Sequence, residues 1–381
     1  MNEVEQEKVV VRGLENVAAA ETRISYVDGV NGQLFYQGYN IHDIAEKVSY
    51  EEVVFLLWNA HLPTKDELST FRSELVAGMR IPSQVVEMIK LTPPTSHPMS
   101  ILRTAVSMLS IYDPDTEDIG SQGNLRKAIR LVAQIPTIIA DLYRVRKRQP
   151  LLSPDPNFGI AANFLYMLRG TPPDELEQKV IDLVMVLHAD HGFNASTFAA
   201  RVIASTLSDM HSALVGGIGA LKGPLHGGAN QKVMKMLREI DNVDMVQAYI
   251  EGMLENKKRI MGFGHRVYRV EDPRARHLRK YSELLSERIG KRYLFEISHR
   301  IEKVVKDAKN IYPNVDFYSA TVQNALGIPE DYYCTVFTAA RSSGWIAHIM
   351  EQYGDNRLIR PTSKYIGEMG RSFIPIENRT T

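Results

Sequence analysis

The sequence predicts an all-α protein that has a large discontinuous helical domain, a smaller inserted helical domain and one small N-terminal β-hairpin. Three observations support this fold class. Apolar residues recur at helical spacing through most of the 381 residues, with prolines and N-cap residues between the segments. Alternation typical of β-strands is convincing only near residues 24–39. A stretch rich in small residues precedes a more charged set of amphipathic segments, and an apolar helical pattern returns after residue 332.

The balance of charge and the cysteine content exclude several classes of protein. The chain has 45 Lys plus Arg and 45 Asp plus Glu, so its formal net charge is zero, which argues against a general nucleic-acid or membrane-surface binder. The single cysteine, Cys334, cannot form an intrachain disulfide and fits a reducing cytosol. The N-terminus has no apolar secretory segment, and no apolar run approaches the roughly 18 residues that span a bilayer. We therefore expect a cytoplasmic protein without nucleic-acid or membrane partners.

The β-hairpin is expected within residues 24–39. Two runs that favour β-structure flank Asp28-Gly29 and Asn31-Gly32. Such pairs adopt the positive φ values that tight hairpin turns need.

Helix starts in the first part of the chain carry clear capping signals. Ser49 with Glu52, and Thr64 with Glu67, each place a hydroxyl three residues before a glutamate, which predicts a capping box. Further helices are expected over residues 99–109, 125–148, 157–168 and 174–190, with a polar loop at 113–123 and a kink at Pro136.

The small-residue stretch suggests where the chain changes domain. We interpret Gly216, Gly217 and Gly219 as a break in the helical pattern and as a hinge. The predicted domains are residues 1–217 for the first part of the large domain, 218–326 for the small domain, and 327–381 for the return of the large domain with a C-terminal arm. Helices of the small domain are expected over residues 233–238, 245–256, 277–289 and 293–309. A cleft between two domains is a common place for a small-molecule site.

The segment Met261–Arg276 is the strongest candidate for a binding function. His265 follows two glycines that let the backbone approach a ligand closely, and four arginines stand within eleven residues. Guanidinium groups suit small multivalent anions such as dicarboxylates and phosphates. A solvated basic loop is the alternative for such a cluster taken alone.

Four other groups stand in settings that favour chemistry. His188 and His191 lie three residues apart near the predicted end of one helix. His226 precedes Gly227-Gly228 at a sharp turn into a helix, and a helix N-terminus disfavours the charged imidazolium. Asp316 lies on an otherwise apolar patch, where an N-cap is its alternative role.

Two other classes of function use the same residues. Side chains acceptable to zinc or a di-metal centre occur at His188, Asp190, His191, His226, His265 and Asp316. They would suit a metal-dependent hydrolase. The neighbouring arginines disfavour a cation and no His-Glu-x-x-His pattern occurs, so we expect no metal site. A helical scaffold without catalysis is the other alternative, and it leaves the glycine-flanked histidines unexplained.

Six segments together resemble the citrate synthase family in order and spacing. They are LHADHGFNASTFAARVIAST, LKGPLHGGANQKVMKML, KKRIMGFGHRVYRVEDPRA, YPNVDFYSATV, ARSSGWIAHIMEQ and RLIRPTSKYIG. The N-terminal segment RGLENVAAAETRISYVDGVNGQLFYQGYNIHDIAE is also similar, so the resemblance covers nearly the whole chain. The chain is similar to the short bacterial and archaeal type, which includes 2-methylcitrate synthases.

The resemblance implies a citrate-synthase-like fold, a homodimer and an acyltransferase. The implied reaction condenses acetyl-CoA with oxaloacetate and water to give citrate and CoA, at the entry to the tricarboxylic acid cycle. It uses no cofactor, since acetyl-CoA is a substrate. A 2-methylcitrate synthase that uses propionyl-CoA, or an enzyme with both activities, is the nearer alternative, and a non-catalytic helical relative is the more distant one.

The resemblance also implies roles for individual residues. The expected catalytic groups are His226 on the thioester carbonyl, Asp316 as the base and His265 on the oxaloacetate ketone. The expected oxaloacetate ligands are His191, His265, Arg274, Arg341 and, reaching in from the partner subunit, Arg360. The expected contacts to CoA are Arg259, Ile260, Met261, Gly262, Phe263 and Arg269.

The implied chemistry needs these types of residue. A carbon acid beside a thioester is far weaker than an aspartic acid with an ordinary pKa of about 3.9. A carboxylate base therefore works only if the enolate is stabilised as it forms, and a neutral histidine donor in a dry cleft can do this. Arginines match the two carboxylates of oxaloacetate, and closure of the domains would keep water from the enol.

Overall fold

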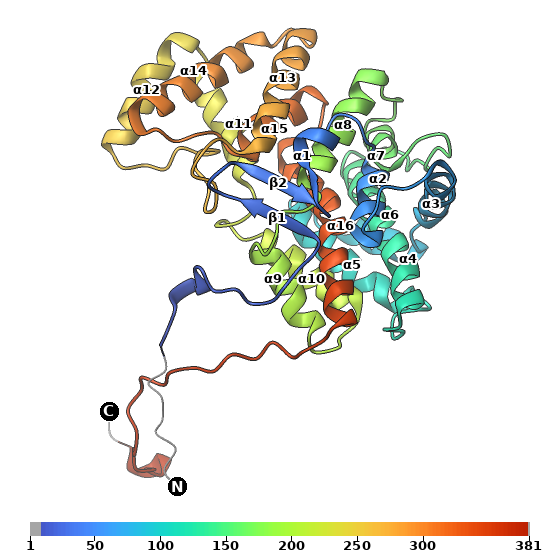
Figure 1. Cartoon of the computed structure of the whole chain (residues 1–381), viewed down its shortest axis with the longest axis vertical. Helices are drawn as coiled ribbons and strands as arrows, with labels where there is room; N and C mark the ends of the chain where they lie inside the picture. The colour runs from blue at the N-terminus through green and yellow to red at the C-terminus, as the bar shows by residue number, and fades with distance from the viewer. Residues whose placement is uncertain (1–8, 380–381) are drawn as a thin grey trace.

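The computed structural model describes residues 9–379. Helices make up most of the folded part, and three short strands form one small sheet (Figure 1). The predicted all-α fold with a small N-terminal β-element is therefore confirmed. Helix α16 (Tyr333–Gly354) runs through the interior, and most of its residues are buried.

The sheet is an antiparallel meander near the N-terminus. Its strands are β1 (Ser25–Asp28), β2 (Gln33–Tyr36) and β3 (Tyr39–Asn40). The predicted hairpin is confirmed, and β3 extends it by one strand. The Asp28 carboxylate holds the β1–β2 turn because it accepts the backbone N–H of Asn31 at 2.9 Å.

The first four helices are α1 (Ile41–Ile44), α2 (Tyr50–Asn59), α3 (Lys65–Gly78) and α4 (Ser83–Leu91). Two of them, α2 and α3, start where the predicted capping boxes place them. Both capping boxes are present: the Glu52 carboxylate accepts the N–H of Ser49 at 2.7 Å, and Glu67 does the same for Thr64. Each box satisfies backbone donors that the first helical turn leaves free.

Four further helices form the central part of the chain. They are α5 (Pro98–Tyr112), α6 (Ser121–Arg146), α7 (Ile160–Arg169) and α8 (Glu175–His188). Helix α6 begins four residues before its predicted start, because its N-cap, Gly120, makes no side-chain cap that the sequence could reveal. The helix continues through Pro136. Helix α8 ends two residues before the predicted end, so His191 lies beyond the helix and not on its face.

The glycine-rich stretch does not break the helix. Helix α10 (Met210–Leu221) runs through Gly216, Gly217 and Gly219, so the predicted break is wrong and nothing supports a hinge at these positions. A Cβ on Gly216 would lie 2.2 Å from Ile203 Cδ1 of α9 (Ala195–Ala204). A Cβ on Gly217 would lie 3.1 Å from Cδ2 of Trp345 in α16. The glycines therefore let α10 pack closely against two neighbouring helices.

The more charged helices gather at one end of the molecule (Figure 1). They are α11 (Ala229–Ile240), α12 (Val246–Glu255), α13 (Pro273–Arg288), α14 (Arg292–Lys309) and α15 (Val315–Ala325). Helix α13 packs on α15, and α12 packs on α14. The predicted helices of this region are confirmed as elements, with shifted bounds. The division of the chain into two domains stays a prediction.

Both ends of the described chain extend away from the folded part on the same side (Figure 1). Residues 355–375 form no helix or strand, as expected for a C-terminal arm. Apolar side chains on this arm face solvent, and Ile366 is 93% exposed and Phe373 83% exposed. The arm therefore has apolar surface that the described residues leave exposed.

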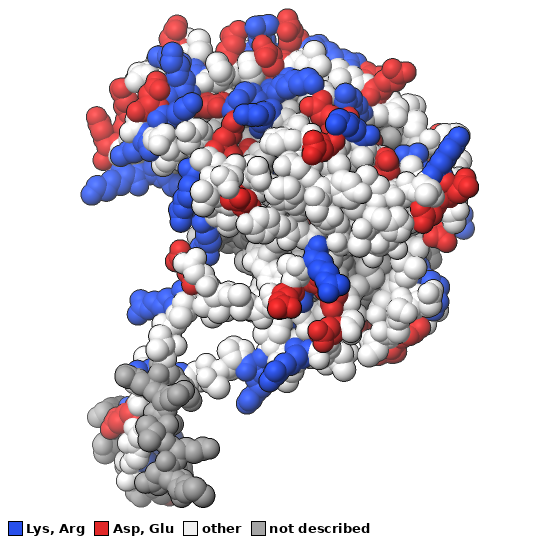
Figure 2. Space-filling view, viewed as in Figure 1, with Lys and Arg blue, Asp and Glu red and all other residues white. Residues whose placement is uncertain are grey.

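Charged side chains of both signs are mixed over helices α12 to α14, and few cover the middle of the visible face (Figure 2).

Within residues 9–379, no helix combines the length and the apolar character needed to cross a membrane.

Two glycines of α10 allow a matched test of the packing argument. A Cβ on Gly219 would meet no atom within 4 Å. Gly219→Ala should therefore raise the free energy of unfolding by about 0.5–1 kcal/mol, because alanine favours helix. Gly217→Ala should lower it by about 1–2 kcal/mol, because the new methyl presses on the Trp345 ring. Chemical denaturation measures both changes, and equal effects would contradict the packing role.

Candidate functional site

The loop that carries His265 lies beside the start of α15. Gly262 and Gly264 have φ values of +79° and +75°. The N–H of Gly264 donates to Tyr312 O at 3.0 Å, and the N–H of Asn314 donates to Gly262 O at 2.9 Å. A Cβ on Gly262 would lie 2.8 Å from the Phe317 ring. The backbone angles favour glycine at both positions, and the close packing requires it at Gly262.

His265 is held as a neutral imidazole of one tautomer. Its Nδ1 lies 3.0 Å from the N–H of Val267 and 3.1 Å from that of Tyr268. Backbone N–H groups only donate, so Nδ1 accepts and the proton sits on Nε2. Burial, followed by the charge of Arg274, lowers the pKa of His265 to about 4. The group can therefore donate one hydrogen bond from Nε2 while uncharged.

His191 lies three residues after the end of α8 and faces the same loop. Its Nε2 is 3.1 Å from the Tyr268 hydroxyl, and its ring centroid is 5.0 Å from that of His265. Burial and then Arg274 lower its pKa well below the ordinary value. His188, by contrast, is buried inside α8 and contacts Val184 O at 2.7 Å, so it is a core residue.

Arg274 is buried at the start of α13 and is held by Asp272. The Asp272 carboxylate accepts from Arg274 Nε at 3.0 Å and Nη2 at 2.8 Å, and from the N–H of Val315 at 3.1 Å. Burial alone would raise the pKa of Asp272, but Arg274 outweighs it and the pKa is lowered. Sequence reasoning missed Asp272, although an Asp-Pro pair at a helix start is a signal for an N-cap.

Asp316 occupies the first turn of α15. Asn314 is the N-cap, since its side chain accepts the N–H of Asp316 at 3.0 Å, so the alternative N-cap role of Asp316 is wrong. Among residues 9–379, the Asp316 carboxylate has no hydrogen bond or ion pair. Burial raises its pKa to about 6, although Arg274 acts in the opposite direction. A carboxylate in this state is a stronger base than an exposed one.

His226 contacts the start of α9. Its Nε2 is 2.8 Å from Ser196 Oγ, which also accepts the indole N–H of Trp345 at 3.1 Å. The Ser196 oxygen is 2.7 Å from Asn194 Oδ1 as well. Burial and then Arg341 lower the pKa of His226 to about 4. Sequence reasoning missed Ser196, because the small-residue run gave no reason to choose one serine.

Arg341 is a buried cation without an ion pair among the described residues. Its Nε donates to His188 O at 2.7 Å, and its guanidinium lies 4.8 Å from the Phe337 ring centroid. Burial lowers its pKa to about 10, partly opposed by Asp190. A buried cation without a partner is costly. Its free donors therefore favour an anionic ligand.

The charges of two arginines show that these groups share one site. Arg274 shifts the pKa of His191, His265 and Asp316. Arg341 shifts the pKa of His191, His226 and Asp316. The structure therefore gathers three neutral histidines, one basic carboxylate and two guanidinium groups from separate segments of the chain.

Other predicted residues lie elsewhere or contribute differently. Arg360 is exposed on the C-terminal arm and contacts no group of this site within the described chain. Arg259 and Arg269 are exposed. Ile260 and Phe263 bury their side chains in the core, so a ligand along this segment would meet the half-buried Met261 and the backbone of Gly262.

Over residues 9–379, no three His, Cys, Asp or Glu side chains gather to hold a metal ion.

Comparison with known proteins identifies the family. The sequence profile described as "Citrate synthase, C-terminal domain" matches residues 13–362. The chain belongs to the citrate synthase family. It is 46% identical to citrate synthase 2 of Bacillus subtilis (strain 168), over 97% of this chain and 99% of the relative. It is 40% identical to the citrate/2-methylcitrate synthase of the same organism, over 93% of this chain and 96% of the relative.

A solved citrate synthase has the same fold. The ternary complex of the Thermoplasma acidophilum citrate synthase with carboxymethyl coenzyme A and oxaloacetate superposes with a TM-score of 0.93. The two sequences are 33% identical, and the match covers 97% of this chain and 100% of that one. The family resemblance noted in the sequence is therefore confirmed for both sequence and fold.

The tautomer of His265 is directly testable. At neutral pH, ¹⁵N NMR should show Nδ1 unprotonated and Nε2 protonated, because two backbone N–H groups point at Nδ1. On acidification the ring should titrate near pH 4, in line with its lowered pKa. His265→Gln assigns the signal by its loss. Titration near the ordinary pKa of about 6.5 would contradict the described environment.

Proposed function

We propose that the protein condenses acetyl-CoA with oxaloacetate and water to give citrate and CoA. The observation that carries this proposal is the half-buried Asp316 carboxylate, which has no hydrogen-bond partner among the described residues and a pKa raised to about 6. It shares one site with three neutral histidines and two buried arginines. The Thermoplasma relative, whose structure holds oxaloacetate and a CoA analogue, supports the same pair of substrates.

Oxaloacetate binds first to the cationic part of the site in this proposal. Arg341 has donors without protein partners in the described chain, and Arg274 is held rigidly by Asp272. Guanidinium groups form paired hydrogen bonds with carboxylates. Nε2–H of His265 donates to the ketone oxygen, which makes the ketone carbon more electrophilic. His191 completes the pocket.

Enolisation follows with Asp316 as the base. Asp316 removes a proton from the acetyl methyl group, and the enolate oxygen accepts a hydrogen bond from Nδ1–H of His226. That tautomer requires Nε2 of His226 to be an acceptor. Ser196 has one hydroxyl proton, and the indole N–H of Trp345 already donates to its oxygen at 3.1 Å. In the active state Ser196 therefore donates to His226 at 2.8 Å and not to Asn194.

Carbon–carbon bond formation and hydrolysis complete the reaction. The enolate carbon attacks the ketone carbon, and the ketone oxygen becomes the hydroxyl of citryl-CoA. Water then attacks the thioester carbonyl, so the C–S bond breaks and CoA leaves as the thiol. The segment from Arg259 to Phe263 with Arg269 contacts CoA in this proposal, and no cofactor or metal takes part.

A thiol-release assay tests the function. The protein should release free CoA from acetyl-CoA only when oxaloacetate is present, since the enolate needs the ketone as its acceptor. Absence of release with both substrates would reject the proposal. Propionyl-CoA is the second acyl donor to test, because a relative that is 40% identical is named for both citrate and 2-methylcitrate synthesis. The ratio of kcat/KM for the two donors decides between them.

We also propose a two-domain arrangement, a homodimer and a cytoplasmic location. The first domain boundary belongs within residues 222–228, since α10 is continuous through residue 217. The exposed apolar arm and the weakly charged middle of the visible face (Figure 2) suit a second copy of the chain. The arm would carry Arg360 into the partner's site. The buried, unpaired Cys334 fits a reducing compartment.

The base assignment predicts a separation of binding from catalysis. Asp316→Asn keeps the size of the side chain but removes the proton acceptor. Condensation should fall by at least about 10³-fold, while calorimetry should show oxaloacetate binding within about threefold of the wild type. Near-normal turnover would reject Asp316 as the base.

The position of Arg360 predicts complementation between two inactive variants. Arg360→Gln and Asp316→Asn homodimers should both be nearly inactive. After equimolar subunit exchange, half of the dimers are mixed, and each mixed dimer has one intact site if Arg360 serves its partner. About a quarter of the wild-type activity should return. No recovery on confirmed exchange would show that Arg360 does not act across the dimer.

A further inference from the structure

One face of α16 holds the segment that carries His191 and Ser196. Four contacts at helical spacing make this connection. Arg341 Nε donates to His188 O, and the N–H of Gly344 donates to Ala189 O. Trp345 Nε1 donates to Ser196 Oγ. His348 Nε2 faces the Asp190 carboxylate. Arg341 and Trp345 already have a part in the proposed site. The pair of His348 and Asp190, both 0% exposed, has none so far.

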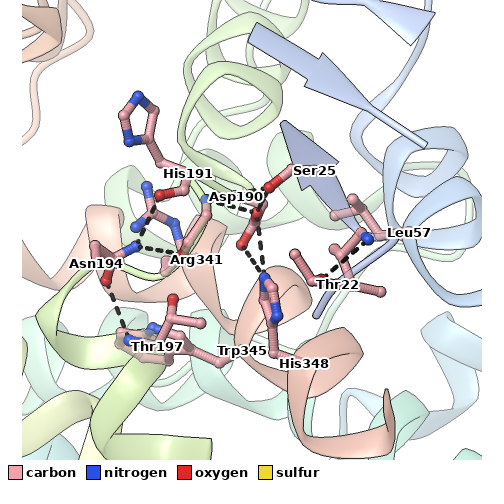
Figure 3. Close-up of polar contacts among 12 residues, drawn as sticks. Thr22, Ser25, Leu57, Asp190, His191, Asn194, Thr197, Arg341, Trp345 and His348 are labelled. Atoms are coloured by element: carbon pink, nitrogen blue, oxygen red, sulfur yellow. Dashed lines mark hydrogen bonds and ion pairs between the residues drawn. The ribbon is translucent and has the colours of Figure 1, made fainter. Parts of the chain in front are cut away.

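Asp190 accepts hydrogen bonds from three separate elements (Figure 3). Its Oδ2 accepts the Ser25 hydroxyl from β1 and the N–H of Gly192 at 3.0 Å. His348 Nε2 lies 3.3 Å from Oδ1 and 3.4 Å from Oδ2. No other described group reaches Oδ1. A fully buried carboxylate needs such donors to remain charged.

The tautomer of His348 follows from Arg201. Arg201 Nη1 is 3.3 Å from His348 Nδ1, and a guanidinium can only donate. Nδ1 of His348 therefore accepts, and Nε2–H points at Asp190. Glu351 at 2.5 Å and Gln352 at 3.1 Å hold Arg201 in place. His348 thus serves as an oriented donor to Asp190.

Asp190 fixes the backbone on both sides of His191. The Tyr36 hydroxyl donates to Asp190 O at 3.0 Å, and the Asp190 carboxylate accepts the N–H of Gly192. Gly192 has a φ of +56°, so the turn is sharp. The His191 ring points away from the Asp190 carboxylate (Figure 3) and reaches the Tyr268 hydroxyl. Asp190 is also the counter-charge that most opposes the lowering of the Arg341 pKa.

We infer that Asp190, oriented by His348, is a positioning residue of the oxaloacetate site. It sets the turn that presents His191. This inference rests on the proposed function and deepens it, because it separates oxaloacetate binding from the acyl-CoA side of the reaction.

Charge and geometry predict opposite results for Asp190→Asn. Loss of a buried negative charge alone would strengthen the attraction between Arg341 and a dianion. An amide, however, places an N–H₂ donor against one of three existing donors, from Ser25, Gly192 or His348. A buried donor that faces another donor stays without an acceptor, and this penalty is large enough to distort the turn. We expect geometry to dominate, so oxaloacetate should bind more weakly.

Isothermal titration calorimetry of the full-length protein with oxaloacetate tests the inference. Asp190→Asn should weaken oxaloacetate binding about 10- to 100-fold, and the KM for acetyl-CoA should stay within about threefold of the wild-type value. His348→Leu should weaken oxaloacetate binding in the same direction. His348→Gln should restore it to within about threefold, because its amide donates to Asp190 and accepts from Arg201.

His211→Gln is the matched control for loss of a buried histidine–aspartate pair. His211 is 1% exposed, lies 3.5 Å from Asp113 and 3.6 Å from Asp209, and belongs to α10. Its replacement should lower the melting temperature without a change in oxaloacetate affinity. Such a result shows that general destabilisation does not mimic the effect at Asp190.

The outcomes separate the inference from the proposed function. Unchanged or tighter oxaloacetate binding by Asp190→Asn, or equal binding by His348→Gln and His348→Leu, would overturn the positioning role. Wild-type protein that binds oxaloacetate but releases no thiol from acyl-CoA would overturn the proposed function and leave the binding comparison intact. If Asp190→Asn fails to fold, the two His348 variants still decide the matter.

Discussion

The site depends on two buried guanidinium groups, only one of which is paired directly with a carboxylate. Arg274 has Asp272 as its ion-pair partner, whereas Arg341 has none among the described residues. Two consequences follow from this arrangement. Nearby histidines stay neutral, since both burial and the arginines lower their pKa values. In the proposed function, a dianionic substrate supplies the direct partner that Arg341 lacks, so oxaloacetate and not the thioester should organise the site first.

Much of the fold was predictable because its signals are local. The capping boxes at Ser49 and Thr64 and the turn after Asp28 each depend on residues within four positions of one another. The start of helix α6 was predicted four residues too late, because its N-cap, Gly120, has no side chain that would mark it in the sequence. The glycines of α10 were misread because their role depends on Trp345, which is more than one hundred residues away. Tertiary packing of this kind leaves no local trace.

The site shows the same division between local and distant information. His226, His265 and Asp316 were predicted from glycine-flanked or apolar settings and from family resemblance. Ser196, Asp272 and Asp190 were not assigned a supporting role, because their partners come from distant elements. Asp190 accepts from β1, from α16 and from its own turn. Sequence patterns thus identified groups that could react, whereas the groups that orient them became visible only in three dimensions.

The position of α16 links substrate binding to subunit association. One helix presents Arg341 and His348 and then continues into the arm that carries Arg360. In the proposed homodimer, oxaloacetate bridges this helix and the partner's arm. Ligand affinity and dimer affinity are then reciprocal quantities. If dimerisation raises the affinity for oxaloacetate by some factor, oxaloacetate must raise the affinity between the subunits by the same factor. The substrate would therefore stabilise the dimer that binds it.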